Sequence, residues 1–321
     1  MGWSIKPKIL FIFKEYVKNL GKTIIHPKIY IMDLIAVVQT LRKQLINQIN
    51  TLPIEVEATV TEETIAQTPC FWIHTPNTIQ EKVILYIHGG SNFMGGIASH
   101  QNLVGKIADG CGVQVLFVEY SLAPEHPFPK AINEIVAVYK ALAKRFDPQD
   151  ILLMGESAGG QNGLALMLQL KEENLAQDSN DIKLPVAFVG LSPAVDLSPE
   201  TIQDNITRID GKDPMLANAD EVNPFFALYY QGHDPKNPLI SPYYGNLAGL
   251  PPLLIYAGSH EALVFQNRDF VQKAQDAGVS VRYEEYEAMH HVWMFYNPTL
   301  PESKKSYAEI AGFVREHLQL S

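Results

Sequence analysis

The sequence has little cysteine and a deficit of positive charge. Cys70 and Cys111 are the only cysteines among 321 residues. Two are too few for a disulfide framework or a zinc cluster, so we expect two reduced, packed thiols. Lys and Arg number 25 against 35 Asp and Glu, which gives a formal net charge of −10. Because the chain also carries no basic stripe, the sequence indicates no nucleic-acid partner.

Long hydrophobic runs are also missing near the N-terminus. The apolar run Ile9 to Phe13 spans only five residues between Lys8 and Lys14. Such a run is too short for a signal-peptide core and far too short to span a bilayer. We therefore expect a cytoplasmic protein. Neither G-x-G-x-x-G nor G-x-x-x-x-G-K-[ST] occurs, so the chain offers no nucleotide-binding loop.

What the sequence does have is a pattern of strands and helices with 46% apolar residues. After two helical patterns near the N-terminus, strand-like runs follow one another with no helix between them, and after Tyr120 strands alternate with helices. The strand-like runs are Ile54–Val60, Cys70–His74, Val83–His88, Val113–Tyr120, Ile151–Met154, Leu184–Leu191, Leu253–Tyr256 and Val279–Tyr286. Helical spacing covers 9–20, 31–49, 131–144, the residues after Ser157, 262–277 and 302–319. This order predicts a single α/β domain, 1–321, with a mostly parallel sheet covered on both faces.

Residues 196–250 interrupt the alternation with prolines and short helical pieces. We expect this segment and about 1–50 to form a helical cap on the domain. The lysines of the first helix leave contact with a membrane open, but packing against the same protein is favoured.

The strand Ile151–Met154 runs directly into Gly155-Glu156-Ser157-Ala158-Gly159, and a helical pattern follows. A strand, a sharp turn and a helix around G-x-S-x-G form a nucleophile elbow, with the serine hydroxyl exposed at its tip. The two glycines omit the Cβ atoms that would clash where strand and helix meet. Ser157 is therefore the candidate nucleophile.

An acyl-transfer serine also needs hydrogen-bond donors for the oxyanion that forms on the substrate. His88-Gly89-Gly90-Ser91 follows the strand that ends at Ile87. Adjacent glycines let backbone N–H groups turn toward a ligand. We expect Gly89, Gly90 and Ala158 to form the oxyanion hole.

The serine needs a base and a group that orients the base. Glu261 follows the strand Leu253–Tyr256, and His290 and His291 follow the strand Val279–Tyr286. The order Ser157, Glu261, His291 is the nucleophile–acid–base order of α/β-hydrolases.

Rival assignments exist for several groups. Neighbouring His290 is the main rival to His291, and Asp196, which also follows a strand, is a rival to Glu261. His126 fits a structural turn better than a base. His260-Glu261 begins like a zinc-binding H-E-x-x-H motif, but Val264 stands where the second histidine would be.

Several collinear motifs between about Lys82 and Trp293 resemble one known family. They are His88–Gly90, Glu119–Pro129, Gly155–Gly160, Leu191–Leu197, Lys212–Met215, and Ile240–Pro242 with Leu250–Pro252. Together they resemble the hormone-sensitive-lipase-like branch of the α/β-hydrolases, which comprises carboxylesterases and lipases and includes arylacetamide deacetylase.

The resemblance implies an α/β-hydrolase fold with an eight-stranded, mostly parallel sheet and a helical cap. It implies Ser157 as nucleophile and Glu261 as acid, where Glu-Ala-Leu stands for the commoner Asp-Pro-Leu. It implies His291 as base, because the family's histidine lies two residues after the methionine, here Met289.

The chain departs from the family pattern around the predicted site. Ser91 stands for the third glycine of H-G-G-G, and Asn92 followed by Phe93 stands for the usual aromatic residue. We expect Ser91 and Asn92 to affect the bracing of the oxyanion loop and the choice of alcohol or acyl group. We expect Ser91, Asn92 and Phe93 to bind substrate. The other departures are Glu156 for aspartate, Ser121 for arginine and Phe265 for aspartate.

The predicted reaction is hydrolysis of a small-molecule ester with a short to medium acyl group, without metal or organic cofactor. Two alternatives stay open. One is a non-catalytic small-molecule receptor, like the related plant gibberellin receptors, although that branch has lost the histidine present here as His291. The other is an amidase or peptidase of the same fold. A homodimer is also left open.

Overall fold

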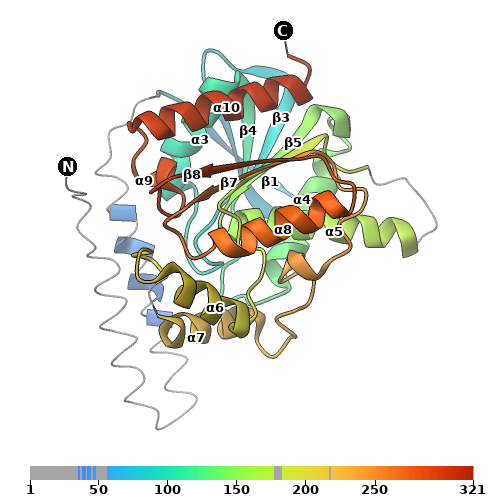
Figure 1. Ribbon diagram of the computed structural model, residues 1–321. Coiled ribbons are helices and arrows are strands. Elements are labelled where there is room, and N and C mark those ends of the chain that lie inside the picture. Colours follow the sequence, from blue (N-terminus) through green and yellow to red (C-terminus); the bar gives the residue numbers. More distant parts are fainter. Residues whose placement is uncertain are drawn as a thin grey trace.

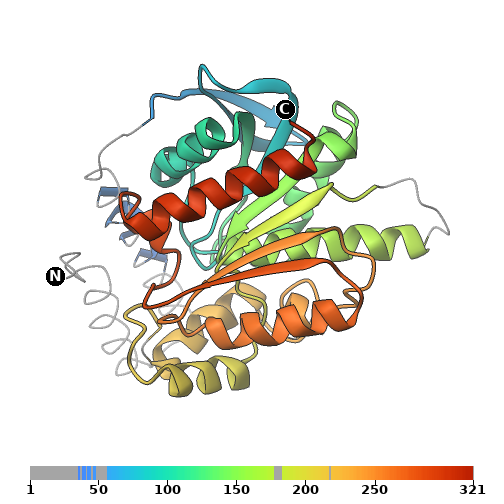
Figure 2. The ribbon, with the colours of Figure 1, turned by 45° about the horizontal axis from the view of Figure 1, so that its top comes forward.

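The computed structural model describes residues 35–47 apart from 37, 41 and 45, and then 56–176, 183–216 and 218–320. An eight-stranded sheet crosses the molecule and carries helices on both faces (Figures 1 and 2). The strand order is β1-β2-β4-β3-β5-β6-β7-β8. The pairs β1–β2 and β2–β4 are antiparallel, and all other neighbours are parallel. The predicted eight-stranded, mostly parallel α/β fold is confirmed.

The strands differ in burial according to their place in the sheet. They are β1 Thr59–Ile65, β2 Thr68–His74, β3 Ile79–Ile87, β4 Val113–Val118, β5 Ile151–Glu156, β6 Ala187–Leu191, β7 Leu253–Gly258 and β8 Val281–Tyr286. Every residue of β4, β5, β6 and β7 is buried, because helices cover both faces of the sheet there. The first strand was predicted at 54–60 but spans Thr59–Ile65. It is a polar, mostly exposed edge strand that lacks the apolar run of the inner strands.

The helices form two layers. They are α3 Ile97–Cys111, α4 Lys130–Leu142, α5 Ala158–Ala176, α6 Pro199–Ile209, α7 Ala219–Tyr230, α8 Val264–Asp276, α9 Trp293–Tyr296 and α10 Pro301–His317. Helices α3 and α10 pack on one face of the sheet, and α4, α5 and α8 pack on the other. The two large apolar clusters between the sheet and these helices form most of the core.

The prediction that no helix lies among the early strands is wrong, because α3 lies between β3 and β4. Its buried side includes Ser99, Gly105 and Ala108, so Leu103, Val104 and Ile107 provide few large apolar residues at helical spacing. A crossover of this kind is what parallel neighbours such as β3 and β4 require.

The described residues between 35 and 47 are helical, in agreement with the predicted helix at 31–49. Val38 is buried, and the Arg42 guanidinium donates to the carbonyls of Phe93 and Ala123 at 2.6 and 2.9 Å. This helix therefore contacts the loops that follow β3 and β4. The predicted helix at 9–20 lies outside the described residues, and the cap role of 1–50 and 196–250 stays a prediction. No helix in the described part of the chain combines the length and apolar character needed to cross a bilayer.

Candidate active site

The carboxyl ends of neighbouring parallel strands bring three distant residues together. Ser157 follows β5, Glu261 lies between β7 and α8, and His291 lies between β8 and α9. The strand order places β5, β6, β7 and β8 side by side, so the loops that follow these strands lie together at the carboxyl-terminal edge of the sheet. Open α/β sheets bind ligands at this edge.

Ser157 occupies a sharp turn with a left-handed backbone, φ 52°. A Cβ added to Gly155 would lie 2.6 Å from the carbonyl carbon of Gly159, and one added to Gly159 would overlap the carbonyl oxygen of Ile87. The Ser157 N–H donates to the Leu191 carbonyl at 2.9 Å, which ties the turn to β6. The glycines of the motif thus permit the close crossing of β5 and α5 that exposes the serine side chain.

A continuous chain of hydrogen-bond contacts links the three side chains. His291 Nε2 lies 2.9 Å from Ser157 Oγ, and His291 Nδ1 lies 3.2 Å from Glu261 Oε2. Glu261 is fully buried and His291 is nearly so. A proton on Nδ1, donated to the carboxylate, leaves Nε2 free to accept the serine hydroxyl proton.

Opposing effects act on the two titratable groups. Burial lowers the pKa of His291, but the hydrogen bond and charge of Glu261, with the charges of Asp213 and Glu156, outweigh it and raise the pKa. Burial raises the pKa of Glu261, and the contact with His291 only partly offsets this. The carboxylate therefore makes His291 a stronger base than an isolated imidazole.

The rival residues have other partners. The His290 ring lies 5.9 Å from the His260 ring, between centroids. Asp196 is buried and accepts hydrogen bonds from Ser198 N–H at 2.8 Å and from the Tyr244 hydroxyl at 2.9 Å. Asp196 therefore anchors the start of α6. His126 is exposed, as expected of a turn residue.

The loop after β3 has an unusual backbone and a buried support. Gly90, Ser91 and Asn92 all have positive φ, at 108°, 56° and 63°. Glu156 Oε1 accepts the Gly89 N–H and also lies 2.8 Å from His100 Nε2, while Glu156 Oε2 accepts the Tyr86 hydroxyl at 2.5 Å. Burial raises the pKa of Glu156, but the contacts with His100 and Tyr86 outweigh it, so the pKa is lowered and the carboxylate stays ionised.

The expected oxyanion role of Gly89 does not fit this geometry, because its N–H is already donated to Glu156. Among the described residues, no hydrogen bond occupies the N–H groups of Gly90, Ser91 or Ala158. These three amides are therefore open to a ligand beside Ser157.

Asn92 and Phe93 were expected to contact substrate, but both side chains are 2% exposed and face the protein interior. Asn92 Nδ2 donates to Gln161 Oε1 at 3.1 Å, and Asn92 Oδ1 accepts from Asn162 Nδ2 at 2.8 Å. Asn92 thus braces the loop from behind. Of Ser91, Asn92 and Phe93, only Ser91 is partly exposed.

Sequence reasoning gave no role to Asp213. This residue lies between α6 and α7, is 1% exposed, and accepts the Ala262 N–H at 2.7 Å. It therefore contacts the backbone directly after Glu261. Since Asp213 and Ala262 are 49 positions apart in the sequence, no local pattern could have revealed this hydrogen bond.

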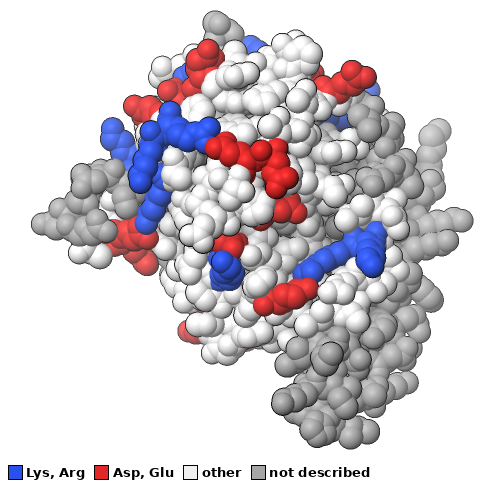
Figure 3. All heavy atoms as spheres, turned by 180° about the vertical axis from the view of Figure 1, so that it is seen from behind, with Lys and Arg blue, Asp and Glu red and all other residues white. Residues whose placement is uncertain are grey.

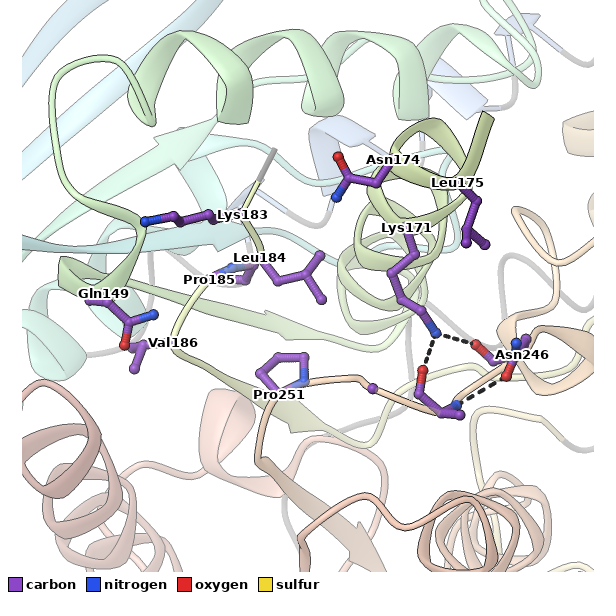
Figure 4. Close-up of a pocket in the computed structure, with 12 residues that line it drawn as sticks. Gln149, Lys171, Asn174, Leu175, Lys183, Leu184, Pro185, Val186, Asn246 and Pro251 are labelled. Atoms are coloured by element: carbon purple, nitrogen blue, oxygen red, sulfur yellow. Dashed lines mark hydrogen bonds between the residues drawn. The ribbon is translucent and has the colours of Figure 1, made fainter. Parts of the chain in front are cut away.

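A separate hollow of about 590 Å³ lies at the opposite edge of the sheet (Figure 4). Its lining includes Gln149, Val186 and Pro251, which precede β5, β6 and β7, whereas Ser157 follows β5. This hollow is therefore not part of the site.

On the face seen in Figure 3, Lys and Arg side chains lie beside Asp and Glu side chains instead of gathering in a basic stripe. The residues that the structure describes contain no cluster of metal-ligating side chains.

The sequence matches a protein family of known fold, and it is similar to proteins that are named as an acetyl-hydrolase or as esterases. Residues 84–295 match the family described as alpha/beta hydrolase fold. An acetyl-hydrolase of Streptomyces hygroscopicus is 35% identical over 78% of this chain and 81% of its own length. An esterase of Acinetobacter venetianus is 34% identical over 72% of this chain and 74% of its own length. A crystal structure of an esterase from the bacterial hormone-sensitive lipase family has a TM-score of 0.80 and 31% identity, and covers 98% of this chain and 100% of that one.

Proposed function

The chain belongs to the α/β-hydrolase family, in its hormone-sensitive-lipase-like branch, and on this premise we propose that it is a serine carboxylesterase. Ser157 is the nucleophile, His291 the general base and Glu261 the acid. The observation that carries the proposal is the continuous contact from Ser157 Oγ through His291 to Glu261 Oε2, at 2.9 and 3.2 Å.

The proposed reaction proceeds through an acyl-serine. His291 takes the Ser157 proton as the oxygen attacks the ester carbonyl carbon, and then donates this proton to the leaving alcohol. His291 takes a proton from water as the water oxygen attacks the acyl-serine. The bond between the acyl carbon and Ser157 Oγ then breaks, His291 returns the proton to Ser157 Oγ, and the carboxylic acid is released. Buried Glu261 keeps the imidazole in the productive orientation and stabilises its cationic form.

The oxyanion that forms in each half-reaction is held by backbone amides. We assign this role to Gly90, Ser91 and Ala158, whose N–H groups have no partner among the described residues. Gly89 instead supports the loop from behind through Glu156. Loss of a single oxyanion donor costs about 3–4 kcal/mol of transition-state stabilisation in enzymes where it has been measured.

The proposed substrate is a small ester with a short to medium acyl group. The name of the Streptomyces hygroscopicus relative, an acetyl-hydrolase, supports a small acyl group. Apolar side chains of α7, among them Phe226 and Tyr229, are buried, as expected of a helix that closes over the domain.

The test is a series of p-nitrophenyl esters from acetate to palmitate, on the wild type and on Ser157→Ala. We expect the highest kcat/KM between acetate and octanoate, and loss of turnover with Ser157→Ala. A fluorophosphonate should label the wild type and leave Ser157→Ala unlabelled. Activity that survives in Ser157→Ala contradicts the assignment of the nucleophile.

The same series separates the alternatives. A receptor of this fold would bind ligands without turnover or labelling. An amidase would hydrolyse p-nitroanilides with kcat/KM equal to or above that for the matching esters. His291, in contact with Ser157, favours turnover over a receptor role.

A further inference from the structure

One buried carboxylate connects the segment between α6 and α7 to the loop that carries Glu261. Asp213 Oδ1 accepts the N–H groups of Met215 and Leu216 at 2.7 and 3.1 Å, which fixes the turn of its own segment. Asp213 Oδ2 accepts the N–H of Ala262 at 2.7 Å. The two oxygens thus hold two segments that are 49 residues apart.

The contact lies at the residue next to Glu261. The Glu261 backbone is also held by its own N–H, which donates to Gly258 at 3.1 Å, and by its carbonyl, which accepts Val264 N–H at 3.2 Å.

Contacts from outside β7 and α8 hold the residues on either side of Glu261. Asp213 accepts the Ala262 N–H, and the His260 N–H donates to the Met289 carbonyl at 3.0 Å in the loop after β8. Because Asp213 and Glu261 are 1% and 0% exposed, water does not screen the repulsion between their carboxylates as it would at the surface. Burial raises the pKa of Glu261, and the charge of Asp213 raises it further.

We propose that Asp213 is a positioning residue of the esterase: through the Ala262 N–H it holds Glu261 in reach of His291. The inference rests on the proposed function, since it requires Glu261 and His291 to act on Ser157. It also makes the position of the acid depend on the segment between α6 and α7, which belongs to the expected cap.

The charge of Asp213 acts together with two other carboxylates. Glu261, Asp213 and Glu156 all raise the pKa of His291 against the effect of burial. Removal of one of these charges should therefore move the pH at which His291 becomes neutral to a lower value. A residue that only stabilised the fold would lower the amount of active enzyme and leave this pH unchanged.

Two substitutions separate charge from geometry. Asp213→Asn keeps the shape but removes the charge, and its amide offers one acceptor oxygen where the carboxylate offers two. We expect kcat to fall about ten- to a hundred-fold, with the acid limb of kcat/KM moved down by about half a pH unit or more. Asp213→Glu keeps the charge but displaces it by one methylene, so kcat should fall while the limb stays near the wild-type pH.

Asp196→Asn is the matched control. Asp196 is also a buried aspartate that accepts a backbone N–H, but it is not among the charges that act on His291. It should lower thermal stability without moving the acid limb. Titration of active sites with fluorophosphonate corrects each variant for misfolded protein.

The inference is overturned if Asp213→Asn retains the wild-type kcat and acid limb, or if Asp196→Asn moves the limb as far. If Asp213→Asn does not fold, Asp213→Glu provides the test. A wild-type kcat in Asp213→Glu then overturns the inference. These outcomes differ from failure of the proposed function, in which Ser157→Ala would keep its activity or the wild type would show none.

Discussion

Asn162 Nδ2 donates to Asn92 Oδ1 at 2.8 Å, although the two residues are 70 positions apart in the chain. Asn162 lies in the second turn of the helix that begins after Ser157, and Asn92 lies in the loop with the open amides. Asn92 Nδ2 reaches the same helix through Gln161 Oε1 at 3.1 Å. The two asparagines therefore fix the distance between the nucleophile and the proposed oxyanion donors.

We predict that Asn92→Ala lowers kcat about ten-fold and changes KM much less. The truncated side chain releases a loop that holds positive φ at both Ser91 and Asn92, so the amides lose their alignment. A double-mutant cycle with Asn162→Ala should give a coupling free energy of about 1 kcal/mol in thermal or urea unfolding. Additive losses of stability would show that the contact is not formed in solution.

Gly159→Ala should abolish activity and destabilise the fold. A methyl group there would overlap the Ile87 carbonyl oxygen, which is backbone and cannot move aside like a side chain. We expect a loss of more than about 2 kcal/mol in the free energy of unfolding. Gly110→Ala is the matched control, because its added Cβ meets no atom within 4 Å and the glycine lies in α3. It should keep full activity and gain up to about 1 kcal/mol. Equal effects of the two substitutions would contradict the close crossing of β5 and α5.

The pH profile of kcat/KM should report His291. The base must be neutral to accept the Ser157 proton, and the neighbouring carboxylates raise its pKa above the ordinary value despite burial. Activity is therefore lost as the pH falls through a midpoint above about 6.5, and regained as the pH rises through it. An acid limb centred well below pH 6 would contradict the raised pKa. The profile is measured with a p-nitrophenyl ester between pH 5 and 9, with spontaneous hydrolysis subtracted.

The sequence predicted that Ser157, Glu261 and His291 lie together, but it did not predict the hydrogen bonds that support them, and the reason is physical. Ser157, Glu261 and His291 each follow a strand, and the carboxyl ends of parallel strands meet at one edge, so strand prediction alone brings them together. The bonds from Glu156 to Gly89 and from Asp213 to Ala262 cross 67 and 49 residues. Such contacts depend on how loops fold back over the sheet, and no local pattern encodes them.

Helix α3 was not predicted from the sequence, because its apolar pattern is weaker than that of the inner strands. Inner strands such as β5 are continuous apolar runs, which a sequence displays directly. Helix α3 buries small and polar residues such as Ser99 and Gly105 under neighbouring elements, so its apolar period is weak. Its existence follows from the parallel pairing of β3 and β4, which only the structure reveals.

Glu156→Gln should weaken both the fold and the reaction. The neutral amide cannot replace the carboxylate that accepts the Gly89 N–H and the Tyr86 hydroxyl and contacts His100. We expect a loss of about 2–4 kcal/mol at pH 7, and a fall in kcat of about ten-fold as the loop loosens. Glu309→Gln is the control. It removes the charge of the carboxylate that accepts the Tyr256 and Tyr286 hydroxyls outside the site, so it should lower stability and leave kcat unchanged.

The stabilisation from Glu156 should depend on pH with a defined sign. Its folded-state pKa is lowered, so the contribution is complete above the unfolded-state pKa of about 4.3 and is lost as the pH falls through the folded-state value. Thermal unfolding of the wild type and Glu156→Gln should therefore differ most near neutral pH and converge below pH 4. A difference that grows as the pH falls would contradict an ionised Glu156.

Arg42→Ala should impair substrate binding more than the chemical steps. The Arg42 guanidinium contacts the Phe93 and Ala123 carbonyls and forms two bonds with Glu125, which fastens the N-terminal helix to the loops after β3 and β4. If this helix is part of the cap, its release opens the site, so KM should rise several-fold while kcat stays within about two-fold. Lys43→Ala is the matched control, because Lys43 is the exposed neighbour on the same helix. The effect should grow with acyl chain length, since longer chains reach further toward the cap. An unchanged KM for every ester would contradict a role of residues 35–47 in the cap, and only 196–250 would remain as the proposed cap.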